Sequence, residues 1–172
     1  LVIIASMMGL GITESLVKET LENASGLKAG IDFGLAYSPQ NIASRPLFED
    51  LVSFSRIVGG INKHSLQIAY LILKTIINGE IVKMEDIKAA EAVKLFEDAY
   101  QNVSAALAND LAKFCEKVGI DCIAIQKAMD IYSNIKMPIP KIIKGKRLKA
   151  SYLLLEEARL ADVRLPMLSL AI

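Results

Sequence analysis

The sequence has no tryptophan, a single histidine and only two cysteines in 172 residues. A zinc site of four cysteine and histidine ligands needs more of these residues, and His64 has no second histidine for a metal pair. Cys115 and Cys122 lie seven residues apart, in a segment predicted to be helix followed by a turn, so a disulfide framework is not expected. These shortages exclude most metalloenzymes, disulfide modules and histidine-based triads. We predict no metal site and a reducing, cytoplasmic location.

An excess of charge of one sign is also missing, since 20 basic and 19 acidic residues leave a net charge of +1. Such a balance provides no electrostatic footprint for nucleic acid or an anionic membrane. The most apolar internal run, residues 66–77, contains Lys74 and is too short to span a bilayer. The apolar start lacks the basic leader and the cleavage site of a signal peptide. We therefore predict a soluble protein without nucleic-acid or membrane partners.

The first half of the sequence alternates between strand and helix patterns. Short apolar runs of the kind found in buried strands occupy residues 1–5, 33–37 and 56–58, with a further candidate strand at 80–84. Between them, residues 13–23, with Thr13 as N-cap, and residues 64–77 have helical spacing. The alternation predicts an α/β domain with a parallel sheet over residues 1–83. Gly59-Gly60 is predicted to close a strand rather than to bind a phosphate.

The second half has a different pattern, because residues 85–118 contain no glycine or proline. Apolar residues recur there at intervals of three and four, from Val93 through Phe96 and Tyr100 to Val118, which predicts one long amphipathic helix. Further helices are predicted over residues 121–133 and 148–160 and from Pro166 onward. We place a domain boundary near residue 84 and an all-α domain over residues 84–172.

Few residues carry recognisable chemistry, since GxGxxG, P-loop and GxSxG motifs do not occur in the sequence. On the long helix, one stripe contains Lys94, Asp98, Asn102 and Asn109. A lysine one turn from a carboxylate can position a substrate oxygen or stabilise developing negative charge. The alternative is an exposed ion pair contributing about 0.3–0.5 kcal/mol, which the residues alone favour.

Two further segments have a functional and a plain interpretation. Gln40 follows Ser38-Pro39 at the predicted carboxyl end of a strand, where α/β sheets bind ligands, but taken alone it is a polar loop residue. The lysine-rich segment 136–149 could contact a phosphate, although a solvated charged loop is the favoured interpretation.

Four stretches resemble the nucleotide-sugar dehydrogenases of the UDP-glucose, GDP-mannose and UDP-N-acetylmannosamine type. They are GLKAGIDFGLAYSPQ, RIVGG, AEAVKLFEDAYQNVSAALANDLAKFCEKVGID and YLLLEEA, in matching order and spacing. The resemblance implies NAD-dependent oxidation of the primary alcohol of a UDP-sugar to a carboxylate, in two steps. It implies that residues 1–83 are the distal part of a Rossmann NAD-binding domain. The central domain, 84–172, would form a homodimer through helix 85–118.

The resemblance also assigns site residues. Lys94 matches the active-site lysine of an AE-x-x-K motif, and Asp98 stands where the family has asparagine. Ser6-Met7 occupies the family's Ser-Thr position at the cofactor and substrate site, and Gln40 replaces the glutamate of Ser-Pro-Glu. The family's glycine fingerprint for NAD and its C-terminal domain are absent, so we expect the chain to be part of a longer protein.

The largest departure lies in the catalytic loop, where a glycine-rich run with a cysteine and a following aspartate aligns with PIPKIIKGKRLKASY. The position of the cysteine nucleophile is Lys146, and that of the aspartate is Ala150. The second oxidation needs a thiolate that forms a covalent intermediate, and an ammonium group cannot replace it. The sequence therefore predicts a catalytically impaired family member, a pseudoenzyme for this step.

Three hypotheses remain open at this point. The first is a nucleotide-sugar dehydrogenase that uses NAD and a UDP-sugar. The second is a non-catalytic homologue that acts as a dimerisation scaffold or partner subunit. The third is a β-hydroxyacid-type dehydrogenase, since that group also has an active-site lysine on a long helix. The Ser-Pro-Gln and Ile-Val-Gly-Gly segments favour the nucleotide-sugar group over the third.

Overall fold

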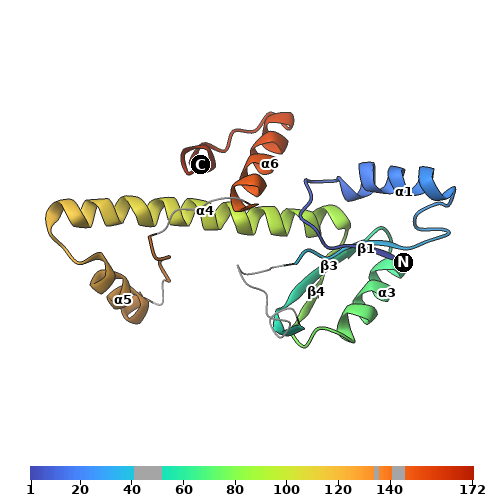
Figure 1. The fold of residues 1–172 in the computed structure, drawn as a ribbon, viewed down its shortest axis with the longest axis horizontal. Coiled ribbons are helices and arrows are strands. Elements are labelled where there is room, and N and C mark those ends of the chain that lie inside the picture. The colour runs from blue at the N-terminus through green and yellow to red at the C-terminus, as the bar shows by residue number, and fades with distance from the viewer. Residues whose placement is uncertain (41–51, 134–135, 141–145) are drawn as a thin grey trace. The chain divides into compact units, whose positions relative to one another are not determined.

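A computed structural model describes residues 1–40, 52–133, 136–140 and 146–172, without the side chains of residues 146 and 147 (Figure 1). The chain divides into two compact units, Leu1–Lys94 and Leu95–Ile172, and the division falls within one long helix. The placement of the boundary near residue 84 stays a prediction.

The first unit contains a four-stranded sheet in the order β1-β2-β3-β4. The strands are β1 (Val2–Ile4), β2 (Leu35–Tyr37), β3 (Arg56–Gly60) and β4 (Ile81–Lys83). The predicted parallel pairing holds for β1 with β2 and for β3 with β4, but it is wrong for β2 and β3, which are antiparallel. An apolar run indicates that a strand is buried on both faces. It does not indicate whether the strand runs parallel or antiparallel to its neighbour.

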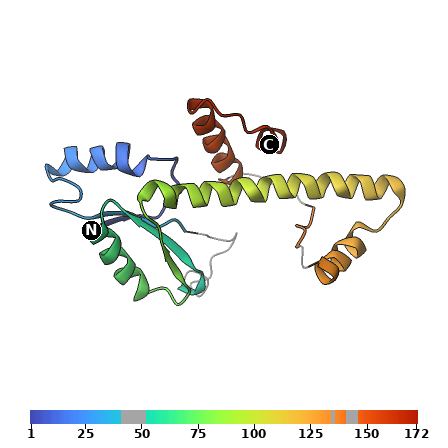
Figure 2. The same cartoon turned by 180° about the vertical axis from the view of Figure 1, so that it is seen from behind.

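Helices cover both faces of this sheet (Figures 1 and 2). Helix α3 (Lys63–Lys74) covers one face, where Ala36, Val58 and Ala69 are fully buried. The other face packs against Leu21 of α1 (Lys18–Ser25) and against Ile87 and Ala90 of α4 (Ile87–Val118). Leu35 and Tyr37 point to that second face while Ala36 points to the first, because successive side chains of a strand alternate.

The glycine pair at the end of β3 allows two helix starts to approach the sheet closely. A Cβ on Gly59 would collide with the backbone of Asp86, just before α4, and a Cβ on Gly60 would collide with the backbone of Leu66 in α3. The prediction that this pair closes a strand is confirmed, since β3 ends at Gly60. Glycine within a strand commonly marks such a close approach.

The first helix begins with a short π-helical turn, η1 (Thr13–Val17), that continues into α1. The prediction of Thr13 as N-cap is wrong: the N-cap residue is Ile12, and no side chain caps the helix locally. The backbone N–H of Thr13 instead donates to the carboxylate of Glu91 at 3.0 Å. The carboxylate of Glu91, distant in the sequence, thus takes the place of a local N-cap side chain.

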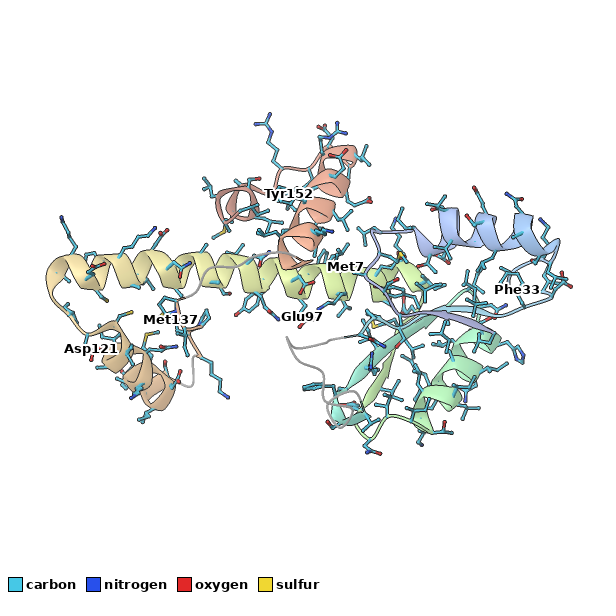
Figure 3. The ribbon with its side chains drawn as sticks, viewed as in Figure 1. Met7, Phe33, Glu97, Asp121, Met137 and Tyr152 are labelled. Atoms are coloured by element: carbon cyan, nitrogen blue, oxygen red, sulfur yellow. The ribbon has the colours of Figure 1, made fainter. Side chains whose placement is uncertain are left out.

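The second unit is all-helical, as predicted. It contains the larger part of α4, followed by α5 (Cys122–Ser133), α6 (Lys146–Leu160) and α7 (Pro166–Leu170). Gly119, with φ of +75°, ends α4 in the left-handed conformation usual after a helix. Asp121 then caps α5, since its Oδ1 accepts from the backbone N–H groups of Ile123 and Ala124 (Figure 3). Cys115 is buried near the end of α4, as expected for a core cysteine.

Helix α4 has two unlike faces in the second unit. Small and polar residues are buried, among them Ala105, Ala108 and Asn102. The predicted apolar stripe is open, with Phe96 58%, Tyr100 75%, Leu107 59% and Phe114 61% exposed. Within the described ranges, no helix has the length and apolarity needed to cross a membrane.

Candidate functional site

Residues that follow β1 and β2 gather at one edge of the sheet. The two strands are parallel neighbours, so their carboxyl ends lie side by side, where open α/β sheets bind ligands. Ser6 and Met7 follow β1, and Gln40 follows β2 (Figure 3 labels Met7). The backbone N–H of Gln40 donates to the carbonyl of Ala5 at 3.2 Å. We call this the ligand edge; it brings together three residues singled out from the sequence.

An arginine lies at the same edge because β3 runs antiparallel to β2. Arg56, the first residue of β3, is 9% exposed and donates from Nη1 to the carbonyl of Pro39 at 3.2 Å. Burial lowers the pKa of its guanidinium below the usual value. Ser38 is buried beside it and donates from Oγ to the carbonyl of Ile57 at 2.7 Å. Sequence reasoning missed Arg56; the signal was an arginine directly opening an apolar strand.

The ligand edge fits one side of a dinucleotide site. The side chains of Ser6 and Gln40 are exposed there and Met7 is half-buried, so polar groups and an apolar surface are both available to a ligand. A phosphate-binding GxGxxG turn does not occur in the sequence.

Lys94 lies at the end of the first unit, half-buried on α4. One turn earlier, Glu91 is fully buried and accepts hydrogen bonds from the backbone N–H groups of Gly11 and Thr13. Sequence reasoning missed Glu91. The available signal was a single carboxylate among Ala89, Ala90 and Ala92, on a helix face suited to burial.

The polar residues that follow on α4 are buried in the second unit. Asp98 is 5% exposed and Asn102 is 0% exposed. Asn102 donates from Nδ2 to Oγ of Ser151 on α6, which is also fully buried. The interpretation of Asp98 as half of an exposed ion pair is therefore wrong, because small residues on this face of α4 let polar neighbours be covered. Asp98 and Asn102 are four residues apart, so the two buried polar side chains lie on the same side of α4.

The positions aligned with the family's catalytic loop are partly described. Lys146 is the first residue of α6, and its side chain lies outside the described residues, as do residues 141–145. Ala150, at the family's aspartate position, is fully buried one turn into α6. Its methyl group can neither accept a proton nor form a hydrogen bond. In the described parts of the chain, no three His, Cys, Asp or Glu residues gather closely enough to hold a metal ion.

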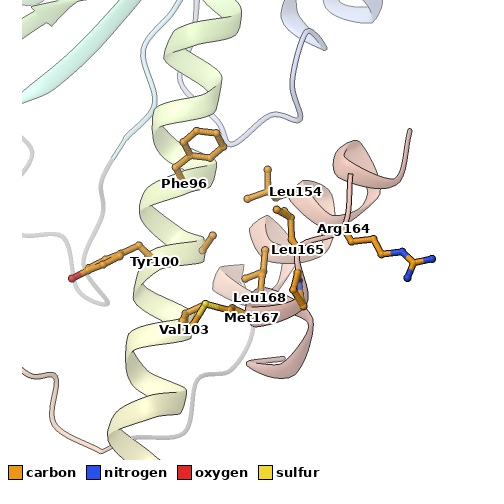
Figure 4. Close-up of a pocket in the computed structure, with 10 residues that line it drawn as sticks. Phe96, Tyr100, Val103, Leu154, Arg164, Leu165, Met167 and Leu168 are labelled. Carbon is orange, nitrogen blue, oxygen red and sulfur yellow. The ribbon is translucent and has the colours of Figure 1, made fainter. Parts of the chain in front are cut away.

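An apolar cavity of about 450 Å³ lies in the second unit between α4 and the α6–α7 segment. Its lining includes Phe96, Val103, Leu154 and Leu168, while the guanidinium of Arg164 points away from it (Figure 4). A nucleotide sugar would find almost no hydrogen-bond partners there, so the cavity is not the candidate substrate site.

An α/β unit followed along the chain by an all-helical unit is an order that this chain shares with a solved dehydrogenase structure. Residues 88–171 match the central domain of the UDP-glucose/GDP-mannose dehydrogenase family. The chain belongs to this family of nucleotide-sugar dehydrogenases.

Individual relatives agree with that assignment. UDP-N-acetyl-D-mannosamine dehydrogenase of Pyrococcus horikoshii is 32% identical over 161 residues, which is 92% of this chain and 38% of the relative. The solved structure of UDP-D-ManNAc dehydrogenase from the same organism has a TM-score of 0.89 at 31% identity, over 99% of this chain and 40% of that one. An NDP-N-acetyl-D-galactosaminuronic acid dehydrogenase from Methanosarcina mazei has a TM-score of 0.81 at 29% identity, covering 99% and 39%. The chain thus spans about two fifths of the length of these relatives.

Proposed function

We propose that this chain is part of an NAD-dependent nucleotide-sugar dehydrogenase that oxidises a UDP-N-acetylhexosamine. We also propose that this enzyme does not carry out the cysteine-dependent second oxidation. The observation that carries the proposal is the ligand edge, where Ser6, Met7 and Gln40 meet beside the buried Arg56. The names of the relatives support the sugar class, since the matched P. horikoshii protein is a UDP-N-acetyl-D-mannosamine dehydrogenase. The two free cysteines fit a cytoplasmic location.

The chain's own residues have separate tasks in the first oxidation. NAD, when bound, would supply the hydride acceptor for oxidation of the sugar carbon. The hydroxyl of Ser6 and the side chain of Met7 would hold the cofactor at the ligand edge, and the ammonium of Lys94 would stabilise an anionic oxygen. Gln40 can orient a water or a hydroxyl through its amide, but it cannot take up a proton as a glutamate would.

The second oxidation needs groups that this chain does not offer at the aligned positions. A thiolate adds to the aldehyde and forms the covalent adduct from which a second hydride leaves. Lys146 carries an ammonium in place of that thiol, and Ala150 carries a buried methyl group in place of a carboxylate. We therefore expect the reaction to stop after one oxidation, with one NADH formed per sugar.

The test uses the full-length protein with NAD and UDP-N-acetylmannosamine, following NADH by absorbance and the product by mass spectrometry. We expect one NADH per sugar and an aldehyde product. Lys94→Ala should reduce the rate by at least about 100-fold, because the developing negative charge loses its stabilising partner. The matched control is Lys113→Ala, which removes an exposed lysine of the same helix. Two NADH per sugar would contradict the impairment.

We also propose a homodimer through α4. The open stripe of Phe96, Tyr100, Leu107 and Phe114 is apolar over several turns, and exposed patches of this kind mark protein interfaces. Absence of NADH formation with UDP-N-acetylmannosamine, UDP-glucose and GDP-mannose would favour the alternative function. In that alternative the chain is a non-catalytic scaffold or partner subunit, and α4 carries the whole of its role.

A further inference from the structure

Glu91 makes a long-range connection within the first unit that the proposed chemistry does not use. Its side chain is fully buried on α4. Oε2 accepts from the backbone N–H of Gly11, and Oε1 accepts from the backbone N–H of Thr13 at 3.0 Å. These partners lie about eighty residues earlier in the sequence. One carboxylate therefore ties the start of the first helix to α4.

The helix that receives this carboxylate has no cap of its own. The first N–H groups of a helix have no partner within the helix, and the N-cap residue Ile12 cannot accept a hydrogen bond with its side chain. Gly11, whose N–H donates to Glu91, has φ of +75°, a conformation that other residues rarely adopt. An anion at a helix N-terminus also interacts favourably with the helix dipole.

The segment between β1 and this helix, residues 5–12, is held at both ends. At its start, the carbonyl of Ala5 accepts from the N–H of Gln40. At its end, the N–H of Gly11 is held by Glu91. Ser6 and Met7 lie between these two attachments, and Met8 packs into the core. Glu91 therefore holds one end of the segment that carries the two ligand-edge residues.

The same turn of α4 carries the proposed catalytic lysine, since Lys94 is three residues after Glu91. A helix is stiff over one turn because its backbone hydrogen bonds join residues four apart. The attachment of residues 5–12 and the backbone of Lys94 are thus parts of one rigid piece.

We propose that Glu91 is a positioning residue, which holds Ser6 and Met7 at a fixed location relative to Lys94 by anchoring residues 5–12 to α4. This inference rests on the proposed function, in which the ligand edge binds a dinucleotide. It differs from a purely structural cap, because loss of Glu91 should weaken cofactor binding more than loss of a carboxylate that holds backbone near the other end of the first helix.

Glu22 offers the matched control. It lies in α1, and its carboxylate accepts from the backbone N–H of Ala29 at 2.9 Å and from Nζ of Lys28 at 3.3 Å. Glu22→Gln therefore removes a carboxylate that holds backbone near the other end of the same helix. Ser6 and Met7 are not attached through it.

The experiment compares Glu91→Gln with Glu22→Gln in the full-length protein, by amide hydrogen exchange and by calorimetric titration with NAD. We expect Glu91→Gln to accelerate exchange over residues 11–17 by about tenfold or more, since a charge-assisted acceptor is lost. The Kd for NAD should rise by about tenfold in Glu91→Gln and by less than about twofold in Glu22→Gln. Gly11→Ala strains the same segment, residues 5–12, and should also raise the Kd for NAD. This second variant provides the test if Glu91→Gln does not fold.

Unchanged exchange over residues 11–17 in Glu91→Gln would overturn the inference. An equal loss of NAD affinity in both glutamate variants would also overturn it, since the role would then be structural only. If the unchanged protein does not bind NAD, the proposed dehydrogenase function fails, and the exchange measurement then decides the anchoring role by itself.

Discussion

The two units of this chain differ in how fully they bury their apolar side chains. In the first, helices cover both faces of the sheet, and Leu35, Tyr37 and Val58 are 0% exposed. In the second, the apolar stripe of α4 stays open, and Leu107 is 59% exposed. Hydrophobic burial drives folding and association through the same physics. We infer that the first unit uses its apolar residues for folding and the second uses much of its stripe for assembly.

Polar residues show the reverse contrast. The ligand edge of the first unit exposes Ser6 and Gln40, whereas the second unit buries Asp98, Asn102 and Ser151. Buried polar groups are costly unless they are hydrogen-bonded, and Nδ2 of Asn102 donates such a bond to Oγ of Ser151. The first unit thus presents polar side chains to solvent at its ligand edge, and the second keeps polar side chains inside its helical packing.

The largest expected effect is on the free energy of unfolding, when one leucine is truncated in the first unit and compared with a leucine truncated in the second. Leu35→Ala removes a fully buried side chain from β2 and should lower the free energy of unfolding by about 2–5 kcal/mol. Leu107→Ala should lower the stability of the monomer by less than about 1 kcal/mol, because most of that side chain is already in water. Urea unfolding at low protein concentration measures both. Similar losses of unfolding free energy in the two variants would contradict the inferred difference between the units.

The next effect concerns association through the open stripe. Replacing Leu107 and Phe114 together by aspartate places charge on the apolar stripe and should raise the dimer dissociation constant by more than about 100-fold. Light scattering across a concentration series measures the shift. Lys113→Asp, an exposed change on the same helix, is the control and should leave the dimer intact. A monomer at every concentration in the unchanged protein would contradict the proposed dimer.

The smallest effect concerns Glu14 in η1. Partial burial, with Asp86 and Glu91 nearby, raises the pKa of its carboxyl above the ordinary value of 4.5. The folded state then holds the proton more tightly than the unfolded state, so stability is lost as pH rises through the raised pKa. Glu14→Gln should therefore stabilise the protein at pH 7, with the gain vanishing below about pH 4.5.

Thermal melting over this pH range checks the prediction for Glu14. Glu19→Gln, on the next turn of the same helix, is the control and should not show the same pH profile. An equal gain for Glu14→Gln at low and neutral pH would mean that ionisation of the Glu14 carboxyl is not what destabilises the fold.

Much of the local structure followed from residue patterns. The spacing of apolar residues predicted α4 over 85–118, and the helix spans Ile87–Val118. Apolar runs located β1, β2 and β3, and the further candidate strand at 80–84 is β4. Strand direction could not be predicted, because burial requires the same residues in parallel and antiparallel pairs. The cap of the first helix was also beyond reach, since Glu91 acts across about eighty residues.

The sequence by itself determined the periodicity of each helix and strand, the glycine pair that closes β3, and the motifs that indicate the family. These are local properties, set by side-chain spacing and backbone freedom within a few residues. Only the tertiary structure decided that Arg56 lies beside Pro39, that Asp98 and Asn102 are buried, and that Glu91 accepts from the backbone of Gly11 and Thr13. Such contacts depend on which distant segments pack together, because hydrogen bonds and burial act through space and not along the chain.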